Sequence, residues 1–294
     1  MSISRLAERA TVITYPDGAV VGDAVVTHVA EHEGRTAIFL DATPFHAVDQ
    51  VWPDQPDDHG TMTVGDRSFP ILGGAIAATD GESLLFGRDI PVRQGTEGWT
   101  FHVAHLLDTH AADVLAEGDA VTVTVDAERR ANLSAAHTAC HLVALALNAA
   151  LDDAWRTPAR RLDGLGHSDF DATAIQSSTI DELLSIDVYR LGKSLRKAGF
   201  DPAALEDLAG VTANVDAQLA AWIAQAPDVR IERDGTALTD RRLWVTTLDG
   251  QRVAIPCGGT HAHNLAALAA VTVAMQLDAA EGGSTLQVTT RVRL

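Results

Sequence analysis

Short stretches in which apolar and polar residues alternate make up most of the first 128 residues of the chain. Alternation with a period of two is typical of β-strands that bury one face. Turns such as Pro16-Asp17-Gly18 and Val64-Gly65-Asp66 separate the stretches. Many short strands joined in this way predict a small N-terminal β-barrel over residues 1–128. The predicted strands are Ala10–Tyr15, Ala19–Val29, Ala37–Asp41, Thr61–Val64, Ser68–Leu72 and Ala120–Asp126, and Thr96–Ala116 is expected to form a loop and a short helix.

The pattern changes in residues 129–294, where longer Ala- and Leu-rich runs appear. Leu133–Leu151 holds neither Gly nor Pro and predicts a long, mostly buried helix with Asn132 at its N-cap. We therefore expect an α+β protein whose second domain, residues 129–294, contains an inserted helical region at about 155–240. Further strands are expected at Leu243–Leu248, Arg252–Pro256 and Thr285–Leu294, and further helices at Asp201–Ala226 and Asn264–Ala280.

Basic residues recur at positions i, i+3, i+6 and i+7 within Thr179–Phe200. On a helix, this spacing would place Arg190, Lys193, Arg196 and Lys197 along one basic stripe. A solvated charged face is the simpler interpretation, and a clamp for RNA phosphates is the functional one. We take these four side chains as candidate substrate-binding residues.

The composition agrees with a cytoplasmic enzyme. The 294 residues are 46% hydrophobic, which is enough for one large or two medium-sized domains. No apolar run approaches the roughly 18–20 residues that a membrane span needs, and the N-terminus lacks the features of a signal peptide. The two cysteines are too few for a disulfide framework. We therefore expect a cytoplasmic protein with no membrane partner.

The formal net charge of −18 argues against a general nucleic-acid binder and against a DNA partner, because phosphate contacts need Lys and Arg. The charge is uneven along the chain. Residues 1–130 hold 8 basic and 21 acidic side chains, whereas residues 131–294 hold 14 and 19. Any contact with RNA is therefore expected from local patches in the second half.

Two short motifs contain metal-binding residue types, HTACH at residues 137–141 and CGGTH at residues 257–261. The two histidines of the first motif are at i and i+4 on the predicted helix, about 5–6 Å apart at Cβ, so both rings can reach one ion. In the second motif two glycines allow the backbone to fold tightly, so that its thiol and imidazole can converge. Each half alone is more simply a core feature, but the two together predict one tetrahedral Zn²⁺ ion. The predicted ligands are His137, His141, Cys257 and His261.

These motifs resemble those of the alanyl-tRNA editing proteins, the free-standing relatives of the alanyl-tRNA synthetase editing domain. The zinc motifs of that family are HTAxHLL-like and CGGTH-like. LDATPF at 40–45 and QPDDHG at 55–60 are similar to its N-terminal signature. VAHLLD at 103–108 and GDAVTVTVDAERR at 118–130 are similar to the segment that leads into the first zinc helix. The similarity covers residues 35–150 and 240–265.

The resemblance implies a fold and an activity. The fold is a small β-barrel followed by an α/β sandwich with helices on one face of an antiparallel sheet. The activity is hydrolysis, in trans, of the ester that joins a wrong serine or glycine to the 3′ end of the alanine tRNA, with one zinc ion. Thr43 is where the family recognises a serine hydroxyl, Gln55 belongs to its active-site signature, and Thr260 is expected to bond to a ligand or to the substrate. We take Thr43 and Gln55 as candidate catalytic residues.

The chain also departs from the family. Pro53-Asp54 replaces the family's Gly-Gly, residues 155–240 do not follow its usual pattern, and AHNLAALAAV follows the second zinc motif. Asp58 is expected to shape a turn. His46 and His105 are expected to be structural.

Four protein ligands close a tetrahedral zinc site, and closed sites are usually structural. Three functions therefore stay open. The chain is an editing hydrolase of aminoacyl-tRNA, a zinc hydrolase of a small ester or amide unrelated to tRNA, or a non-catalytic RNA-binding module with a structural zinc. A monomer and a homodimer also stay open.

Overall fold

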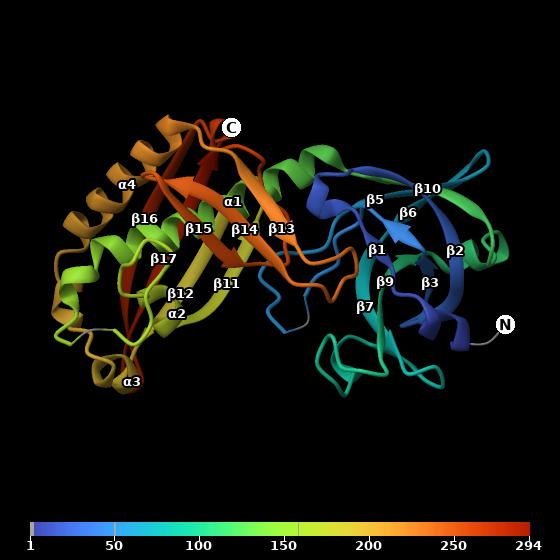
Figure 1. Cartoon of the computed structure of the whole chain (residues 1–294), viewed down its shortest axis with the longest axis horizontal. Helices are drawn as coiled ribbons and strands as arrows, with labels where there is room; N and C mark the ends of the chain where they lie inside the picture. The colour runs from blue at the N-terminus through green and yellow to red at the C-terminus, as the bar shows by residue number, and fades with distance from the viewer. Residues whose placement is uncertain (1–2, 50, 158) are drawn as a thin grey trace. The chain divides into compact units, whose positions relative to one another are not determined.

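The structure is a computed structural model that describes residues 3–49, 51–157 and 159–294 (Figure 1). It is an α+β protein, as expected from the sequence. The chain forms two compact units that are described separately below. The first contains residues 1–130, 231–242 and 258–260, and the second contains residues 131–230, 243–257 and 261–294.

Eight antiparallel strands of the first unit form one sheet in the order β6-β5-β10-β2-β3-β9-β7-β8. A short parallel pair, β1 with β4, lies outside this sheet. The strands of the first unit are β1 (Val12–Ile13), β2 (Val21–His32), β3 (Arg35–Leu40), β4 (Ala42–Thr43), β5 (Gly60–Val64), β6 (Arg67–Ile71), β7 (Gly73–Thr79), β8 (Leu84–Phe86), β9 (Thr100–Leu107) and β10 (Ala120–Val125). Short 3-10 helices occur at Ile3–Glu8, Tyr15–Asp17, Gly87–Asp89 and Thr109–Asp113. Among the described residues β6 and β8 end the sheet, so its closure into the expected barrel is not confirmed.

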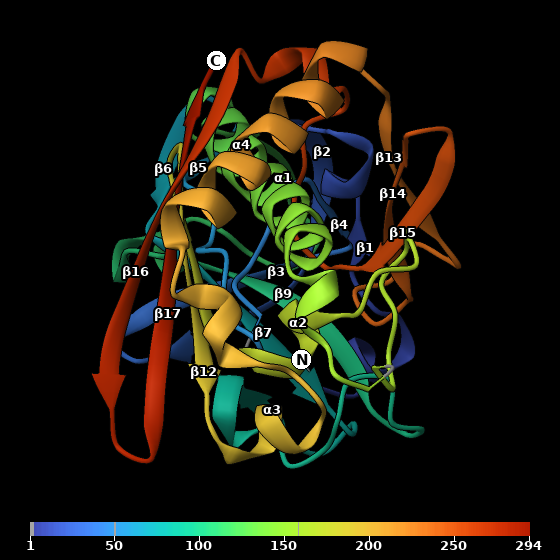
Figure 2. The same cartoon turned by 90° about the vertical axis from the view of Figure 1, so that its left-hand side faces the viewer.

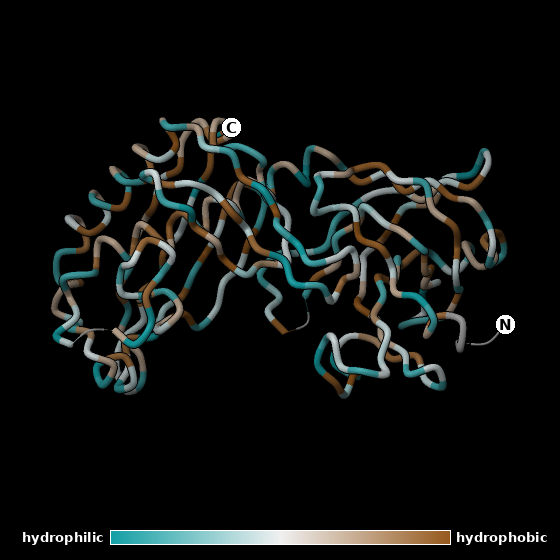
Figure 3. The backbone as a smooth tube through the Cα atoms, in the orientation of Figure 1, coloured by the Kyte–Doolittle hydropathy of each residue, from teal (hydrophilic) through white to brown (hydrophobic). Residues whose placement is uncertain are grey.

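The segment 96–116, expected to be a loop and a short helix, instead contains strand β9. Its residues are buried on both faces, because the sheet carries a core on each side. Phe101 and Val103 belong to the larger core, whereas Ala104 and Leu106 belong to the smaller one. A strand buried on both faces shows no alternation of apolar and polar residues, so the period-two pattern could not identify it. Figure 3 colours the backbone by hydropathy and shows hydrophobic and hydrophilic stretches interspersed along the chain.

Four antiparallel strands of the second unit form a sheet in the order β11-β12-β17-β16. A smaller sheet has the order β13-β14-β15. The strands are β11 (Ile175–Asp181), β12 (Leu184–Leu191), β13 (Val229–Arg233), β14 (Arg242–Leu248), β15 (Gln251–Pro256), β16 (Ala270–Ala280) and β17 (Gly283–Arg293). The helices are α1 (Ala127–Ala150), α2 (Phe170–Ala174), α3 (Lys193–Lys197) and α4 (Leu208–Gln225), with 3-10 turns at Asp152–Ala154, Pro202–Leu205 and Leu265–Ala267. Helices α1 and α4 lie on one side of the four-stranded sheet (Figure 2). The strands predicted at 243–248, 252–256 and 285–294 are confirmed.

Helix α1 begins six residues before the predicted start. Asp126 caps it, since its carboxylate accepts a hydrogen bond from the backbone N–H of Arg129 at 3.0 Å, so Asn132 is not the N-cap. Among the described helices, α1 alone is long and apolar enough to cross a membrane, against our expectation that no such run exists. Most of that apolar window, 72%, is buried inside the protein, as in a core helix.

Two helical predictions in the second unit are wrong. Residues 184–191 form β12 and only 193–197 form a helix, so the four basic residues do not share a helical stripe. The segment 264–280 is mainly the strand β16, paired with β17 over its whole length. Asp216 of α4 accepts a hydrogen bond from the backbone N–H of Val273 at 3.0 Å and so satisfies part of the free edge of β16. The inserted region 155–240 is therefore a mixture of strands and helices.

Candidate metal centre

Helix α1 supplies half of the candidate site. It is rich in Ala and Leu, residues with high helix propensity, so the backbone at the first motif is a regular helix. The rings of His137 and His141 lie on one face with their centroids 5.0 Å apart. Leu133 and Ala136 of the same helix pack against Ile180 of β11. The helix is therefore anchored to the sheet close to the turn that carries the first imidazole.

The hairpin β14–β15 supplies the other half. Its turn at Asp249-Gly250 has left-handed backbone angles, with φ of 51° and 77°, which suit a tight hairpin turn. The pairing of β14 with β15 ends at Pro256, directly before Cys257. Trp244 of β14 is fully buried, and its ring lies 5.2 Å from that of His141. The hairpin thus covers one of the two helical histidines.

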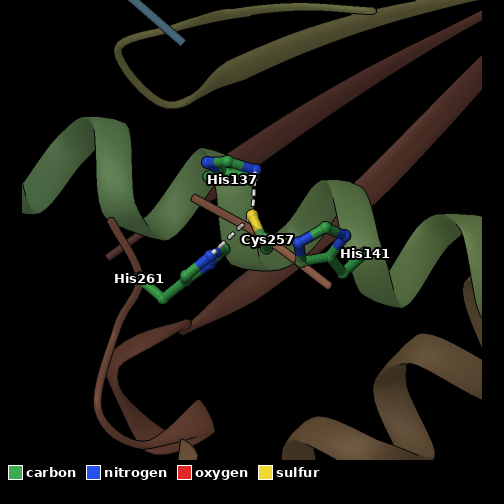
Figure 4. A group of neighbouring side chains, drawn as sticks. All are labelled: His137, His141, Cys257 and His261. Carbon is green, nitrogen blue, oxygen red and sulfur yellow. Dashed lines mark hydrogen bonds between the residues drawn. The ribbon is translucent and has the colours of Figure 1, made fainter. Parts of the chain in front are cut away.

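The four predicted ligands come together within the second unit (Figure 4). The sulfur of Cys257 lies 3.4 Å from Nε2 of His137 and 3.3 Å from Nε2 of His261. The four ligand atoms lie within 4.8 Å of one another. In a tetrahedral zinc site a sulfur and a nitrogen ligand are about 3.6 Å apart. The cluster therefore has the spacing and the donor types to hold one metal ion.

The protonation state of His141 also suits a metal. Nε2 of His141 is buried and has no hydrogen-bond partner among the described residues, and burial lowers the pKa of His141 to about 4. This ring is neutral at pH 7 and can offer a lone pair. Burial without a partner is costly for such a nitrogen, and a metal ion would satisfy it.

Thr138 orients the third imidazole. Its hydroxyl oxygen accepts a hydrogen bond from the backbone N–H of Ala262 at 3.0 Å and lies 3.4 Å from Nδ1 of His261. If Nδ1 carries the ring proton and donates it to Thr138, then Nε2 of His261 is free of a proton on the side that faces the sulfur. Groups of this kind fix the tautomer and direction of metal-binding histidines. Sequence analysis did not assign this role to Thr138, although the residue lies between the two helical ligands.

The candidate residue Gln55 binds the second motif in the first unit. Its amide nitrogen donates to the hydroxyl of Thr260 at 2.9 Å, and its amide oxygen accepts from the backbone N–H of Thr260 at 2.9 Å. Tyr15 donates to the carbonyl of Gly258 at 3.1 Å. These contacts restrain residues 258–260, which follow Cys257 and precede His261 in the chain. Gln55 is 1% exposed, so it is a buried glutamine whose amide is held by Thr260.

Thr43, the other candidate catalytic residue, lies in the core of the first unit. Its hydroxyl oxygen accepts from the backbone N–H of Phe45 at 3.1 Å and lies 2.8 Å from Nε2 of His105. Nδ1 of His105 lies 3.1 Å from the carbonyl of Ile38, which can only accept, so Nδ1 carries the proton and Thr43 donates to Nε2. Both side chains are at most 1% exposed. His105 is a satisfied structural histidine, as expected.

The acidic residues of the QPDDHG motif form structural contacts. Asp58 is fully buried and pairs with the guanidinium of Arg130, which also donates to the carbonyl of Pro44 at 2.8 Å. Asp58 also accepts from the backbone N–H of His46 at 2.6 Å. Asp57 accepts from the backbone N–H of Gly74 at 2.6 Å. Asp58 therefore joins its own loop to the loop of His46 and to Arg130, whereas residues 56–59 form no turn of the expected kind.

Cys140 and His263, which lie within or next to the two motifs, and the four basic candidates all lie outside the metal cluster. The thiol of Cys140 points to Asp187, 3.5 Å away, and neither cysteine forms a disulfide. His263 is exposed. Arg190 lies on β12 and donates to the carbonyl of Glu281 at 3.1 Å. The other three basic candidates, Lys193, Arg196 and Lys197, lie on α3 and are exposed.

Comparison with known proteins adds no family to this description. No protein-family model matches the chain. No curated protein matches it either. The likeness to editing proteins therefore rests on the quoted motifs alone.

Proposed function

We propose that the protein is a zinc-dependent hydrolase that acts in trans, in the cytoplasm, on aminoacylated alanine tRNA. It would cleave the ester that joins a wrong serine or glycine to the 3′ end. One observation carries the proposal: motifs of the editing type bring four ligand atoms within 4.8 Å of one another. A small N-terminal barrel belongs to the same proposal. The backbone hydrogen bond from Leu72, after β6, to Leu106 of β9 at 2.7 Å supports it.

Hydrolysis of an aminoacyl ester does not require a strong general base. An aminoacyl ester is already activated, so the enzyme mainly has to orient a water molecule and stabilise a developing oxyanion. Zinc, when bound to His137, His141, Cys257 and His261, would supply Lewis-acid polarisation. Thr138 would hold the His261 ring in place, and burial keeps His141 neutral. Cys257 and His141 are half-buried, whereas His137 and His261 are buried.

A structural zinc in a non-catalytic RNA-binding module is the second candidate. Four protein ligands fill a tetrahedral coordination sphere and leave no position for a water molecule or a substrate. This ligand count favours the structural role. The net charge of −18 favours a third candidate, a zinc hydrolase of a small ester or amide. These functions differ in a measurable way, because only the first requires hydrolysis of aminoacyl-tRNA.

The deciding experiment measures deacylation of seryl- and glycyl-tRNA made with the alanine tRNA, using protein of known zinc content. The Cys257→Ala variant should lose both the metal and the hydrolysis. Cys140→Ala is the matched control, because it removes the other thiol, which bonds to Asp187 instead. This control should keep one zinc ion and full activity.

Failure would be equally informative. Folded, zinc-loaded protein that leaves both tRNAs acylated would refute the editing function. Retained hydrolysis in a metal-free Cys257→Ala variant would refute the role of zinc. If that variant unfolds, chelation of the wild-type protein followed by re-addition of zinc tests the same point without a substitution.

A further inference from the structure

A basic pocket lies in the second unit, built from two chain segments. The backbone N–H of Arg156 donates to the carbonyl of Gly199 at 2.9 Å, and that of Asp201 donates to the carbonyl of Ala154 at 2.8 Å. A bridge between Trp155 and Phe200 lies between these bonds. The segments 154–157 and 199–201 are therefore held as a small antiparallel pair, and the pocket between them is preformed.

The pocket has a rigid floor and a tight corner. Phe200 is 2% exposed, and its ring packs against those of Trp155 and Phe170 at 5.5 and 4.9 Å. Gly199 has a φ of 111°, and a Cβ there would overlap the hydroxyl of Thr157. Only glycine adopts this backbone without strain. The cavity that results has a volume of about 470 Å³, which is within the range of small-ligand sites.

The charge of the pocket is opposite to that of the chain. Arg156, Arg196 and Lys197 line it, and among the described residues Asp201 is the one acidic side chain in its lining. The carboxylate of Asp201 is already used, because it accepts from Arg156 at 2.5 Å and from the backbone N–H of Ala203 at 3.2 Å. The hydrogen bond from Arg156 is the main cause that lowers the pKa of Asp201. Arg196 and Lys197 carry the charge that remains for a ligand.

We propose that this pocket binds a phosphate group. Arg offers a planar fork of N–H donors and Lys offers a point charge, the pair of groups that proteins use for phosphate. The volume leaves room for more of the ligand than the phosphate itself. The phosphate chemistry rests on the pocket alone, whereas the choice of an RNA phosphodiester rests on the proposed function.

The four basic residues of the sequence offer a matched pair of variants. Arg196 and Lys197 line the pocket, whereas Arg190 and Lys193 do not. Arg196→Gln with Lys197→Gln and Arg190→Gln with Lys193→Gln each remove two positive charges from the same stretch of chain. All four side chains are exposed, so both variants should fold, and thermal melting checks this.

Binding of uncharged alanine tRNA should be measured against salt for the wild type and both variants. The pocket variant should bind about ten- to hundredfold more weakly, as expected for lost charge-assisted hydrogen bonds, and its salt slope should fall by about one. The control variant should stay within about twofold to threefold. Equal losses in both variants would show diffuse electrostatics and overturn the proposal, as would no loss in either.

Inorganic phosphate and adenosine monophosphate test whether the pocket binds a phosphate group independently of RNA. Both should shift the backbone amide resonances of Thr157 and Gly199 in the wild type and not in the pocket variant. Shifts with these probes but no binding of tRNA would support a phosphate site and refute RNA as the ligand. No shift with any probe, and no weakening of tRNA binding, would refute the site. Because none of these measurements involves deacylation, failure of the editing function leaves their outcome intact.

Discussion

The metal cluster of the second unit and the Asp58 network of the first unit are both built from polar side chains, yet they differ in how their atoms are satisfied. Asp58 is fully buried and is bonded by Arg130 and by the backbone N–H of His46. In the metal cluster, Nε2 of His141 has no hydrogen-bond partner among the described residues. Two sulfur–nitrogen distances, 3.3 and 3.4 Å, are also close to the distance between two ligand atoms of one zinc ion.

This difference separates two roles for buried polar groups. A network whose hydrogen bonds are made by the protein itself fixes the fold and needs no ligand. Sulfur and nitrogen atoms that face one another, with one nitrogen lacking a hydrogen-bond partner among the described residues, can be satisfied by a bound metal ion. The comparison favours a mainly structural role for QPDDHG and a metal-binding role for the two histidine motifs.

Among these predictions, the largest effect is the loss of stability that acid causes in the first unit. Burial lowers the pKa values of His46, His102 and His105 from 6.5 to about 4. The unfolded chain therefore takes up protons between these values that the folded chain does not. Stability from the neutral rings is complete above pH 6.5 and is lost as the pH falls toward 4, by about 3 kcal/mol for each ring. Urea unfolding at pH 7, 6 and 5 measures this loss.

His105→Gln sharpens the acid experiment, because glutamine cannot take up the proton. The slope of the unfolding free energy with pH should fall by about 1.4 kcal/mol per pH unit. Zinc should leave the contribution of His105 unchanged, because the candidate metal ligands are His137, His141, Cys257 and His261. A slope unchanged by the substitution would contradict burial as the cause of the pKa of His105.

Asp58→Asn should have the next largest effect. The substitution leaves the guanidinium of Arg130, a residue that is 5% exposed, without its charged partner. Breaking a buried pair in this way costs about 3–5 kcal/mol of unfolding free energy. Asp17→Asn is the matched control, because Asp17 pairs with Arg233 at 2.7 Å but is 59% exposed, and it should cost less than about 1 kcal/mol. Similar losses in both variants would break the comparison between the two regions.

The sequence predicted the metal ligands better than it predicted the elements around them. A metal ion restricts the residue types that can bind it and their spacing. HTACH and CGGTH could therefore be recognised from five adjacent residues each. The strand β16 shows the opposite case. Its Ala-rich sequence favours a helix by propensity, but Val271 and Val273 both face the core from positions two apart, and the pairing with β17 decides. The propensity of a segment's own residues does not predict which distant strand it pairs with.

The prediction of a basic stripe was wrong for a related reason. Spacing alone placed Arg190 on the same helix as Arg196, whereas Gly192 lies between β12 and α3. The pocket beside Arg196 depends on Arg156, which is 40 residues away in the chain and is joined through backbone hydrogen bonds that no side-chain pattern reveals. Thr138 was missed because its role depends on Ala262 and His261, which approach it only in the folded protein.

Thr138→Val should have the smallest effect, and it tests the metal side of the comparison directly. Valine keeps the shape of threonine but cannot accept the hydrogen bond from Nδ1 of His261, so the ring is less well oriented. Loss of such a partner lowers metal affinity by about 10–100-fold, measured by competition with a chromophoric zinc chelator. Thr246→Val is the matched control, because Thr246 is also fully buried but donates to the carbonyl of Asp228 at 2.8 Å. Both variants lose one buried hydroxyl, so a similar fall in stability is expected for each. Only Thr138→Val should weaken zinc binding, and equal zinc affinities in the two variants would mean that Thr138 merely anchors Ala262.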